Sequence, residues 1–270
     1  MFSLRMLGSG SAGNAMLIQS DSTALLVDAG LSAKQLVARL RLCDVDPSTL
    51  NGLLLTHEHA DHAGGLRVFC TKYEIPCYCN RLTAEALKAE LANISCKLFT
   101  NGTEFTIGDI DVRPFSVPHD AADPLGFCLA HDDVYFGILT DLGHATRLVF
   151  ESLRGIHGLL IETNHDEVLL QRDTKRPWSV KQRILSRHGH LSNDSAAQIV
   201  RQLADSSPLN QLILGHLSKD CNRPELATQR IDQELKLAGR CSTNIHCATQ
   251  EAVSQTILVT STAPDSFRKL

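Results

Sequence analysis

The segment 53–65, with the sequence LLLTHEHADHAGG, constrains the fold of this chain more than any other stretch. Its three leucines predict a buried strand, and the six residues that follow the threonine hold three histidines and two acids. At the exit of a strand, residues two apart point the same way, so His57 and His59 should converge, with Asp61 and His62 close behind them. So many polar groups beside a core cost free energy unless something binds them. The segment therefore predicts a divalent-metal site rather than a polar surface turn.

Single titratable residues also stand at the ends of four other predicted strands: Asp28, His119, Asp141 and His216. One such residue is usually a polar group satisfied by its own neighbours. Four of them, together with the histidine segment, indicate strand ends that share one edge of the sheets. We therefore expect a site for two metal ions.

Length and composition indicate one globular domain. The chain has 270 residues, of which 43% are hydrophobic, and a net charge of −4. We expect a single domain over residues 1–270. The net charge gives no global case for nucleic-acid or membrane binding, and no apolar run approaches the roughly 20 residues of a membrane helix. The start shows no secretory pattern, and nine cysteines without a CxxC pair indicate reduced thiols and a cytoplasmic protein. Cys77 and Cys79 are interpreted as core filling rather than as metal ligands.

Strand-like and helix-like runs alternate in both halves of the chain. Ser32 and Thr83 are expected to cap two helices of the first half. Residues 95–140 show the pattern of antiparallel hairpins, which disfavours a single doubly wound parallel sheet. Two sheets packed together, with helices outside, fit this order better. The sequence therefore predicts an α/β fold.

The motifs HEHADH, Asp28, His119, Asp141 and His216 resemble, in order, the five motifs of the metallo-β-lactamase superfamily. The resemblance spans nearly the whole chain and implies a four-layer αββα sandwich with a dinuclear site at one edge. It implies that one metal is held by His57, His59 and His119. It implies that the other is held by Asp61, His62 and His216, with Asp141 bridging the two and Asp28 supporting the histidine loop.

Four other stretches are similar to the YycJ-type subgroup of that superfamily: 8–14, 161–166, 182–194 and 214–227. The subgroup implies a metal-dependent phosphodiesterase, a 5′-to-3′ exonuclease acting on DNA. Aspartate rather than cysteine at the bridging position disfavours lactam hydrolysis. A hydrolase of small cyclic phosphodiesters or thioesters remains the alternative. A metal-binding regulator with a degraded site is the weakest reading, because every expected ligand position is filled.

The expected cofactors are two divalent ions per chain. Zinc suits an imidazole-rich site, and manganese is the alternative. Two metals about 3.5–4 Å apart lower the pKa of a shared water, so that a bridging hydroxide can attack phosphorus. Asp61 therefore counts as both a ligand and a catalytic residue. Of the remaining histidines, His190 is our first candidate to protonate the leaving oxygen or grip a phosphate, and His165 the second.

The segment 172–190 supports a phosphate substrate independently of the resemblance. It holds six lysines or arginines against one aspartate, a local charge of +5, and Lys181 and Arg183 are its expected contacts to a phosphate backbone. The alternative is a solvated helix face. Trp178, the only tryptophan, either stacks on a base or, as we favour at this point, packs against the core.

Further substrate contacts are expected from a glycine-rich loop and from two short polar stretches. Glycines in residues 8–14 would let the backbone approach an anion, although a plain hairpin turn fits equally well. The side chains expected to bind substrate are Ser9, Ser11, Asn14, Asn164, Ser192 and Asn193. Ser192 or Asn193 should also cap the next helix. We expect DNA rather than RNA as the partner, and the sequence leaves the oligomeric state open.

Overall fold

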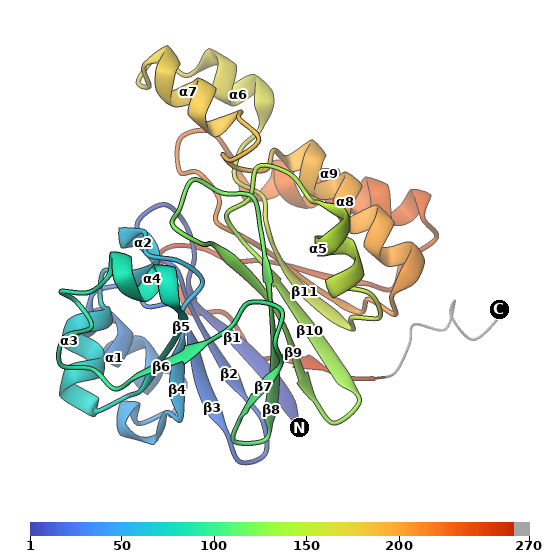
Figure 1. Ribbon diagram of the computed structural model, residues 1–270. Helices are drawn as coiled ribbons and strands as arrows, with labels where there is room; N and C mark the ends of the chain where they lie inside the picture. The colour runs from blue at the N-terminus through green and yellow to red at the C-terminus, as the bar shows by residue number, and fades with distance from the viewer. Residues whose placement is uncertain (262–270) are drawn as a thin grey trace. The chain divides into compact units, whose positions relative to one another are not determined.

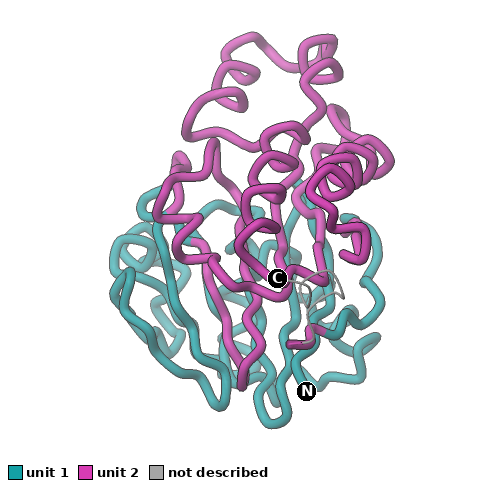
Figure 2. Tube along the Cα trace, turned by 90° about the vertical axis from the view of Figure 1, so that its right-hand side faces the viewer, with its two compact units in different colours: residues 1–116, 121–125, 249–258 teal, residues 117–120, 126–248, 259–270 magenta. Residues whose placement is uncertain are grey.

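The computed structural model describes residues 1–261, and its contacts group the chain into two compact units, coloured separately in Figure 2. Unit 1 comprises Met1–Ser116, Ala121–Leu125 and Thr249–Leu258. Unit 2 comprises Val117–Asp120, Gly126–Ala248 and the described residues from Val259. The single-domain organisation over residues 1–270 stays a prediction.

Unit 1 is built on a seven-stranded mixed sheet with the strand order β14-β1-β2-β3-β4-β5-β6. Its strands are β1 (Phe2–Gly8), β2 (Ala15–Gln19), β3 (Ala24–Val27), β4 (Gly52–Leu54), β5 (Cys77–Asn80), β6 (Cys96–Phe99) and β14 (Ile257–Val259). The strands β1, β2 and β3 are antiparallel neighbours, whereas β3 to β6 run parallel. Parallel strands are buried on both faces, which explains why β3 and β4 are almost wholly apolar.

Helices cover this sheet because their apolar residues recur at helical spacing. The helical segments of unit 1 are α1 (Ala33–Arg41), η1 (Pro47–Thr49), α2 (Ala60–Ala63), α3 (Leu66–Tyr73) and α4 (Arg81–Ala86). Leu36 of α1 and Phe69 of α3 are fully buried in one core cluster with Leu26 and Leu53 of the sheet. Figure 1 shows α1 and α3 on one side of the strands β3 to β6.

The two predicted helix caps of unit 1 have different outcomes. Ser32 caps α1 as expected, and it forms a capping box with Gln35. The expectation for Thr83 is wrong, because Asn80 caps α4 and its side chain accepts a hydrogen bond from the Thr83 backbone N–H. An asparagine at the end of a strand can cap a helix that starts at once, so α4 begins earlier than its apolar spacing indicates.

Unit 2 is built on a second seven-stranded mixed sheet, with the order β13-β12-β11-β10-β9-β8-β7. Its strands are β7 (Phe105–Ile107), β8 (Ile110–Ser116), β9 (Leu125–His131), β10 (Val134–Leu139), β11 (Gly158–Glu162), β12 (Gln211–Gly215) and β13 (Asn244–Cys247). The pairs β7–β8 and β9–β10 are the predicted antiparallel hairpins, and β10 to β13 run parallel. The hairpin prediction was wrong for β6, which pairs in parallel with β5 in the other sheet.

The helices of unit 2 are α5 (Arg147–Ser152), α6 (Glu167–Arg172), α7 (Trp178–Ile184), α8 (Asn193–Ser206) and α9 (Pro224–Leu237). Helices α8 and α9 pack against each other, and with α5 they lie on one side of the strands β9 to β11 (Figure 1). Helices α6 and α7 instead form a pair that projects away from those strands (Figure 1). We call residues Glu167–Ile184 the α6–α7 hairpin.

The cysteines do not crosslink the chain, and most of them are buried. All nine are free thiols, and Cys77 and Cys79 are fully buried beneath the helices of unit 1, which confirms their reading as core residues. Within residues 1–261, no helix is both long enough and apolar enough to cross a membrane.

Candidate metal centre

The histidine segment of unit 1 follows β4, a strand in the interior of the sheet. His57 and His62 are buried, with 1% and 0% of their surface exposed. The ring centroid of His57 lies 4.6 Å from that of His59 and 4.2 Å from that of His62. Nε2 of His62 is 3.6 Å from a carboxylate oxygen of Asp61. Three imidazoles and one carboxylate are therefore concentrated within six residues of chain.

Asp28 holds this segment in place from the end of the neighbouring strand β3. Its carboxylate accepts hydrogen bonds from the Thr56 backbone N–H at 2.9 Å and from the Thr56 hydroxyl. Nδ1 of His62 lies 2.7 Å from the same carboxylate. With Nδ1–H donating to Asp28, Nε2 of His62 carries the lone pair of the ring, which is the atom a metal ion would take. Parallel pairing of β3 with β4 is what brings Asp28 and Thr56 together.

The candidate ligands of unit 2 come from several strand ends rather than from one segment. The strands β10, β11 and β12 are parallel neighbours, so their carboxyl ends meet at one edge of the sheet. Asp141, Glu162 and His216 lie at these ends, and His190 joins them from the loop before α8. One donor atom from each of these four residues lies within 4.8 Å of the other three. They form a group that could hold a metal ion.

The contacts within this group are short. Nδ1 of His216 is 3.0 Å from an Asp141 carboxylate oxygen and 3.2 Å from one of Glu162. Nδ1 of His190 lies 2.6 Å from Glu162. His119, after β8, has its Nε2 3.8 Å from Asp141, while its Nδ1–H donates to the Gly189 carbonyl at 3.1 Å. Because Nδ1 carries the proton of that hydrogen bond, Nε2 is the atom of His119 that could bind a metal ion.

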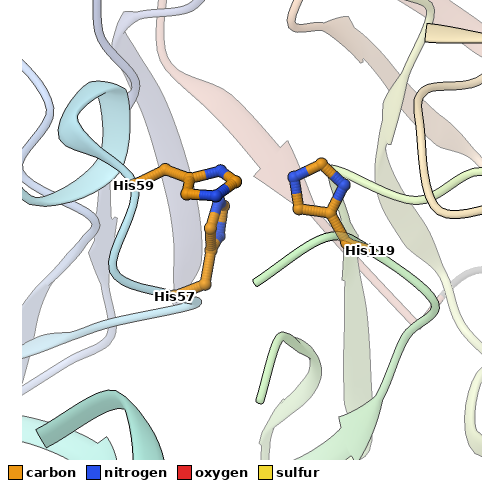
Figure 3. Close-up of side chains that lie close together, drawn as sticks. All are labelled: His57, His59 and His119. Atoms are coloured by element: carbon orange, nitrogen blue, oxygen red, sulfur yellow. The ribbon is translucent and has the colours of Figure 1, made fainter. Parts of the chain in front are cut away.

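Figure 3 shows three of these imidazoles as sticks: the rings of His57 and His59 on the segment after β4, and the ring of His119 on the segment after β8. The donor sets of both units consist of imidazole nitrogens and carboxylate oxygens. Such a mixture suits zinc or manganese, and it suits neither a magnesium site of oxygens alone nor a thiolate site. The residues present therefore fit divalent transition metals in each unit.

Strained backbone accompanies the site. Asp28, Asp141 and His216 have φ angles of 60°, 53° and 54°, in the left-handed region that non-glycine residues rarely adopt. Asp28 and His216 directly follow β3 and β12, and Asp141 lies two residues past the end of β10. Such conformations persist only where the surroundings enforce them, and they gather at functional sites. The turn after each strand therefore has the backbone conformation that aims its side chain.

Glu162 belongs to the candidate ligand group of unit 2, although it was not among the site residues expected from the sequence. It is fully buried, and besides His190 and His216 it accepts hydrogen bonds from the backbone N–H groups of Leu142 and Leu191. Burial alone would raise the pKa of Glu162, but the charge and hydrogen bond of His190 outweigh it and lower the pKa to about 2. Its position at the end of an apolar strand, as for Asp141, was the available signal.

The two candidate acid–base histidines differ in their surroundings. Burial works against the charged form of His190, but Glu162 and Asp141 overcome it, and the pKa of His190 is raised. Burial lowers the pKa of His165. Both ring nitrogens of His165 are buried and have no hydrogen-bond partner among residues 1–261. His190 is therefore the histidine suited to carry a proton, and His165 the one suited to stay neutral.

Both of the cations expected to bind phosphate in the basic segment 172–190 form contacts within unit 2. Lys181 is buried, and its ammonium donates to the carbonyls of Gln171, at 2.9 Å, and of Asp173. Arg183 is exposed and pairs with Asp120. These contacts account for Lys181 within the fold of the α6–α7 hairpin, without a substrate.

The glycine-rich loop 8–14 closes on itself. Asn14 accepts hydrogen bonds from the Ser9 hydroxyl and the Gly10 N–H, both at 3.0 Å, and its amide nitrogen lies 3.2 Å from Nε2 of His62. Ser11 is exposed at the tip of the loop. Ser9 and Asn14 thus shape the loop beside His62. Of the three loop residues expected to bind substrate, only Ser11 is exposed to solvent.

The polar residues around β11 and α8 form a network of their own. Asn164 donates to the His216 carbonyl at 3.1 Å, and Asn193 donates to Asn222 at 2.9 Å. Ser192 caps α8, as one of the two expected caps, and donates to Glu167. These residues fix the loops from which His190 and His216 extend.

The domain family described as "Beta-lactamase superfamily domain" matches residues 23–216. This range covers most of the chain and includes Asp28 and all the candidate metal ligands from His57 to His216. The chain belongs to the beta-lactamase superfamily.

Two curated members of the superfamily are similar to this chain over most of their length. The exodeoxyribonuclease YycJ of Bacillus anthracis is 36% identical over 237 residues, which cover 87% of this chain and 89% of the relative. The exodeoxyribonuclease WalJ of Streptococcus pneumoniae is 37% identical over 243 residues, which cover 88% and 89%. These matches support the YycJ-type subgroup that the sequence motifs resemble.

Solved structures confirm the superfamily fold. The metallo-β-lactamase fold protein YhfI from Bacillus subtilis has a TM-score of 0.72 at 15% identity, over 94% of this chain and 100% of that chain. Zinc-bound PqqB from Methylobacterium extorquens has a TM-score of 0.68 at 14% identity, over 94% and 99%. The predicted α/β metallo-β-lactamase sandwich is therefore the fold of this chain.

Proposed function

We propose that this chain is a metal-dependent 5′-to-3′ exodeoxyribonuclease. The observation that carries the proposal is the 36–37% identity to exodeoxyribonucleases over nearly the whole chain, a span that contains both ligand sets. A small-molecule hydrolase on the same fold would not require that resemblance. The absence of a CxxC pair and the nine free thiols support a cytoplasmic place of action.

The proposal includes one centre for two divalent ions, zinc in the first instance and manganese as the alternative. His57, His59 and His119 would hold one ion, and Asp61, His62 and His216 the other. Asp141 would bridge them, with Asp28 and Glu162 behind the ligands. When bound, such ions polarise the scissile phosphate and make water nucleophilic at neutral pH. The remaining work falls to the side chains around them.

His190 is the proposed donor of a proton to the leaving oxygen. Glu162 occupies its Nδ1 at 2.6 Å and holds the ring in one orientation, so Nε2 is the atom that would carry the proton to substrate. The raised pKa of His190 favours the protonated ring before the bond breaks. A positioned general acid contributes about 10²- to 10⁴-fold in rate. His165, kept neutral by burial, is the second candidate to grip a phosphate.

The test uses duplex DNA with a 5′ phosphate and a label at one end, with Mn²⁺ or Zn²⁺ added. Wild-type protein should shorten the strand stepwise from its 5′ end, and Asp61→Ala should not. RNA of the same sequence in parallel reports the sugar preference. If wild-type protein that carries two metals per chain leaves the DNA intact with either ion, the nuclease proposal is wrong. Small phosphodiesters and thioesters would then be the substrates to assay.

The role of His190 has a separate test. His190→Ala should lower turnover about 10²-fold or more while the metal content, measured by elemental analysis, stays at the wild-type level. The structure gives a reason to measure both, because His190 also belongs to the group with Asp141, Glu162 and His216. Loss of metal from His190→Ala would make it a ligand instead of the proton donor.

A further inference from the structure

The single tryptophan of this chain stands on the surface, contrary to our expectation that it packs against the core. Trp178 is 63% exposed at the first position of α7, and Leu185, at the end of the same helix, is 47% exposed. Residues seven apart lie on one side of a helix, so these two side chains share a stripe. The two residues are about two turns, roughly 10 Å, apart along the helix. Exposed large apolar side chains on one face of a helix mark a site of interaction.

The element that carries this stripe is firmly braced within unit 2. The buried ammonium of Lys181 closes the turn between α6 and α7 by donating to two of its carbonyls. Arg176 bonds to Asp173 at 2.8 Å and to Asp220 at 3.1 Å, and Lys175 bonds to Asp220 at 2.7 Å. Asp220 lies in the loop after β12, so the α6–α7 hairpin is tied to the sheet. Trp178 is therefore presented on a fixed support.

In the part of the chain that the structure describes, two arginines near the ends of α6 and α7 have no carboxylate partner, and the exposed Glu167 at the start of α6 bonds only to Ser192. Arg172 and Arg187 are exposed, and neither forms an ion pair with a carboxylate anywhere in residues 1–261. Arg187 instead contacts Nε2 of His144 at 3.0 Å. Two guanidinium groups without a carboxylate partner, on the segment that carries an exposed aromatic ring, complement a phosphate backbone.

The same segment leads directly into the candidate site. Five residues separate the end of α7 at Ile184 from His190. Within that stretch, the Gly189 carbonyl accepts the hydrogen bond from His119 described above. The Asp120 N–H donates to the His188 carbonyl at 3.1 Å. A DNA strand held on α7 would therefore lie next to the loop that contacts His119 and carries His190.

We propose that the Trp178–Leu185 stripe of α7 is a stacking platform for the bases of single-stranded DNA. The inference rests on the proposed nuclease function and extends it, since it names how the polymer is held. Every base offers a π-face, so stacking suits an enzyme that degrades DNA of any sequence. Arg172 and Arg187 would hold the backbone of the strand. Trp178 binds substrate in this account and takes no part in the chemistry.

The first experiment compares kinetics on a polymer and on a small substrate. Trp178→Ala should raise KM for single-stranded DNA roughly 5- to 150-fold, the range for loss of one base–aromatic stack. The ratio of kcat/KM on DNA to kcat/KM on bis(p-nitrophenyl) phosphate should fall by the same factor. Trp178→Phe should restore most of it. Leu148→Ala removes a matched exposed side chain from α5, 52% exposed, and should leave the ratio unchanged.

The second experiment uses the tryptophan itself as the probe. Because Trp178 is the only tryptophan, the intrinsic fluorescence of the metal-loaded protein reports on this one site. A phosphorothioate oligothymidylate, which resists hydrolysis, should quench it in a saturable way. Arg172→Ala should weaken that binding and reduce its salt dependence by about one ion.

The outcomes separate the platform from the nuclease. An unchanged KM together with no quenching overturns the platform, whether or not DNA is degraded. Saturable quenching without degradation supports the platform and sinks the nuclease. A fluorescence change that depends on protein concentration alone, with a matching dimer in sedimentation, means that a second copy of the chain covers the stripe, and it also overturns the proposal.

Discussion

The two most polar runs of the sequence, residues 57–62 and residues 172–190, behave differently once folded. The first follows a buried strand, and its three imidazoles lie with centroids 4.6 Å and 4.2 Å apart around His57. The second lies on a projecting pair of short helices, and four of its six cations are engaged by carboxylates or carbonyls of unit 2. Polar groups at a buried strand end are there to bind something. Polar groups on a small surface element are needed first to hold that element together.

The largest effect is expected in the first run. His57→Ala should lower kcat/KM on DNA about 10³-fold or more, because it would remove an ion that stabilises several kcal/mol of developing charge. Metal content per chain should fall with it. The matched change in the second run, Arg183→Ala, should keep the metal. Full activity and full metal content in His57→Ala would show that residues 57–62 are not needed to bind metal, and the difference from residues 172–190 would be lost.

A smaller loss of metal affinity is expected from Asp28, which supports the candidate ligand His62. Asp28→Asn removes the carboxylate that accepts hydrogen bonds from Thr56 and His62. Loss of such a supporting carboxylate typically costs 10- to 100-fold in metal affinity. Competition with a chelator should show that loss, while saturating metal restores much of the activity. If saturating metal restores nothing, Asp28 acts on the fold rather than on the orientation of His62.

Lys181 offers the sharpest test of what the cations of the second run do. Lys181→Met should destabilise unit 2 by about 1–3 kcal/mol, because it leaves the carbonyls of Gln171 and Asp173 without their donor. Thermal or urea unfolding measures this. The salt dependence of DNA binding should not change. A slope reduced by about one ion, with unaltered stability, would instead restore Lys181 as a phosphate contact.

These contrasts explain how far the sequence could be read. Residues 57–62 were interpretable because their geometry is local: the loop after β4 and the first turn of α2 carry all four candidate ligands within six residues. Glu162 was undervalued because its neighbours, His190 and His216, are 28 and 54 positions away and meet it only through the parallel pairing of β11 with β12. Trp178 was assigned to the core because a lone tryptophan is usually buried. Its exposure depends on a hairpin whose bracing partner, Asp220, lies in a distant loop.

The smallest expected effect is the pH dependence of the ion pairs that brace the α6–α7 hairpin. The hydrogen bond from Arg176 lowers the pKa of Asp173 to about 2, from an ordinary value of 3.8. A carboxylate with a depressed pKa contributes stability that is complete above its unfolded value and is lost as pH falls through the folded one. The α6–α7 hairpin should therefore loosen between about pH 4 and pH 2, and Trp178 fluorescence should report it. Asp173→Asn should lose this step and show weaker bracing already at neutral pH. If the wild-type transition persists unchanged in Asp173→Asn, another acid controls the hairpin, and Asp220, which pairs with both Lys175 and Arg176, is the next to replace.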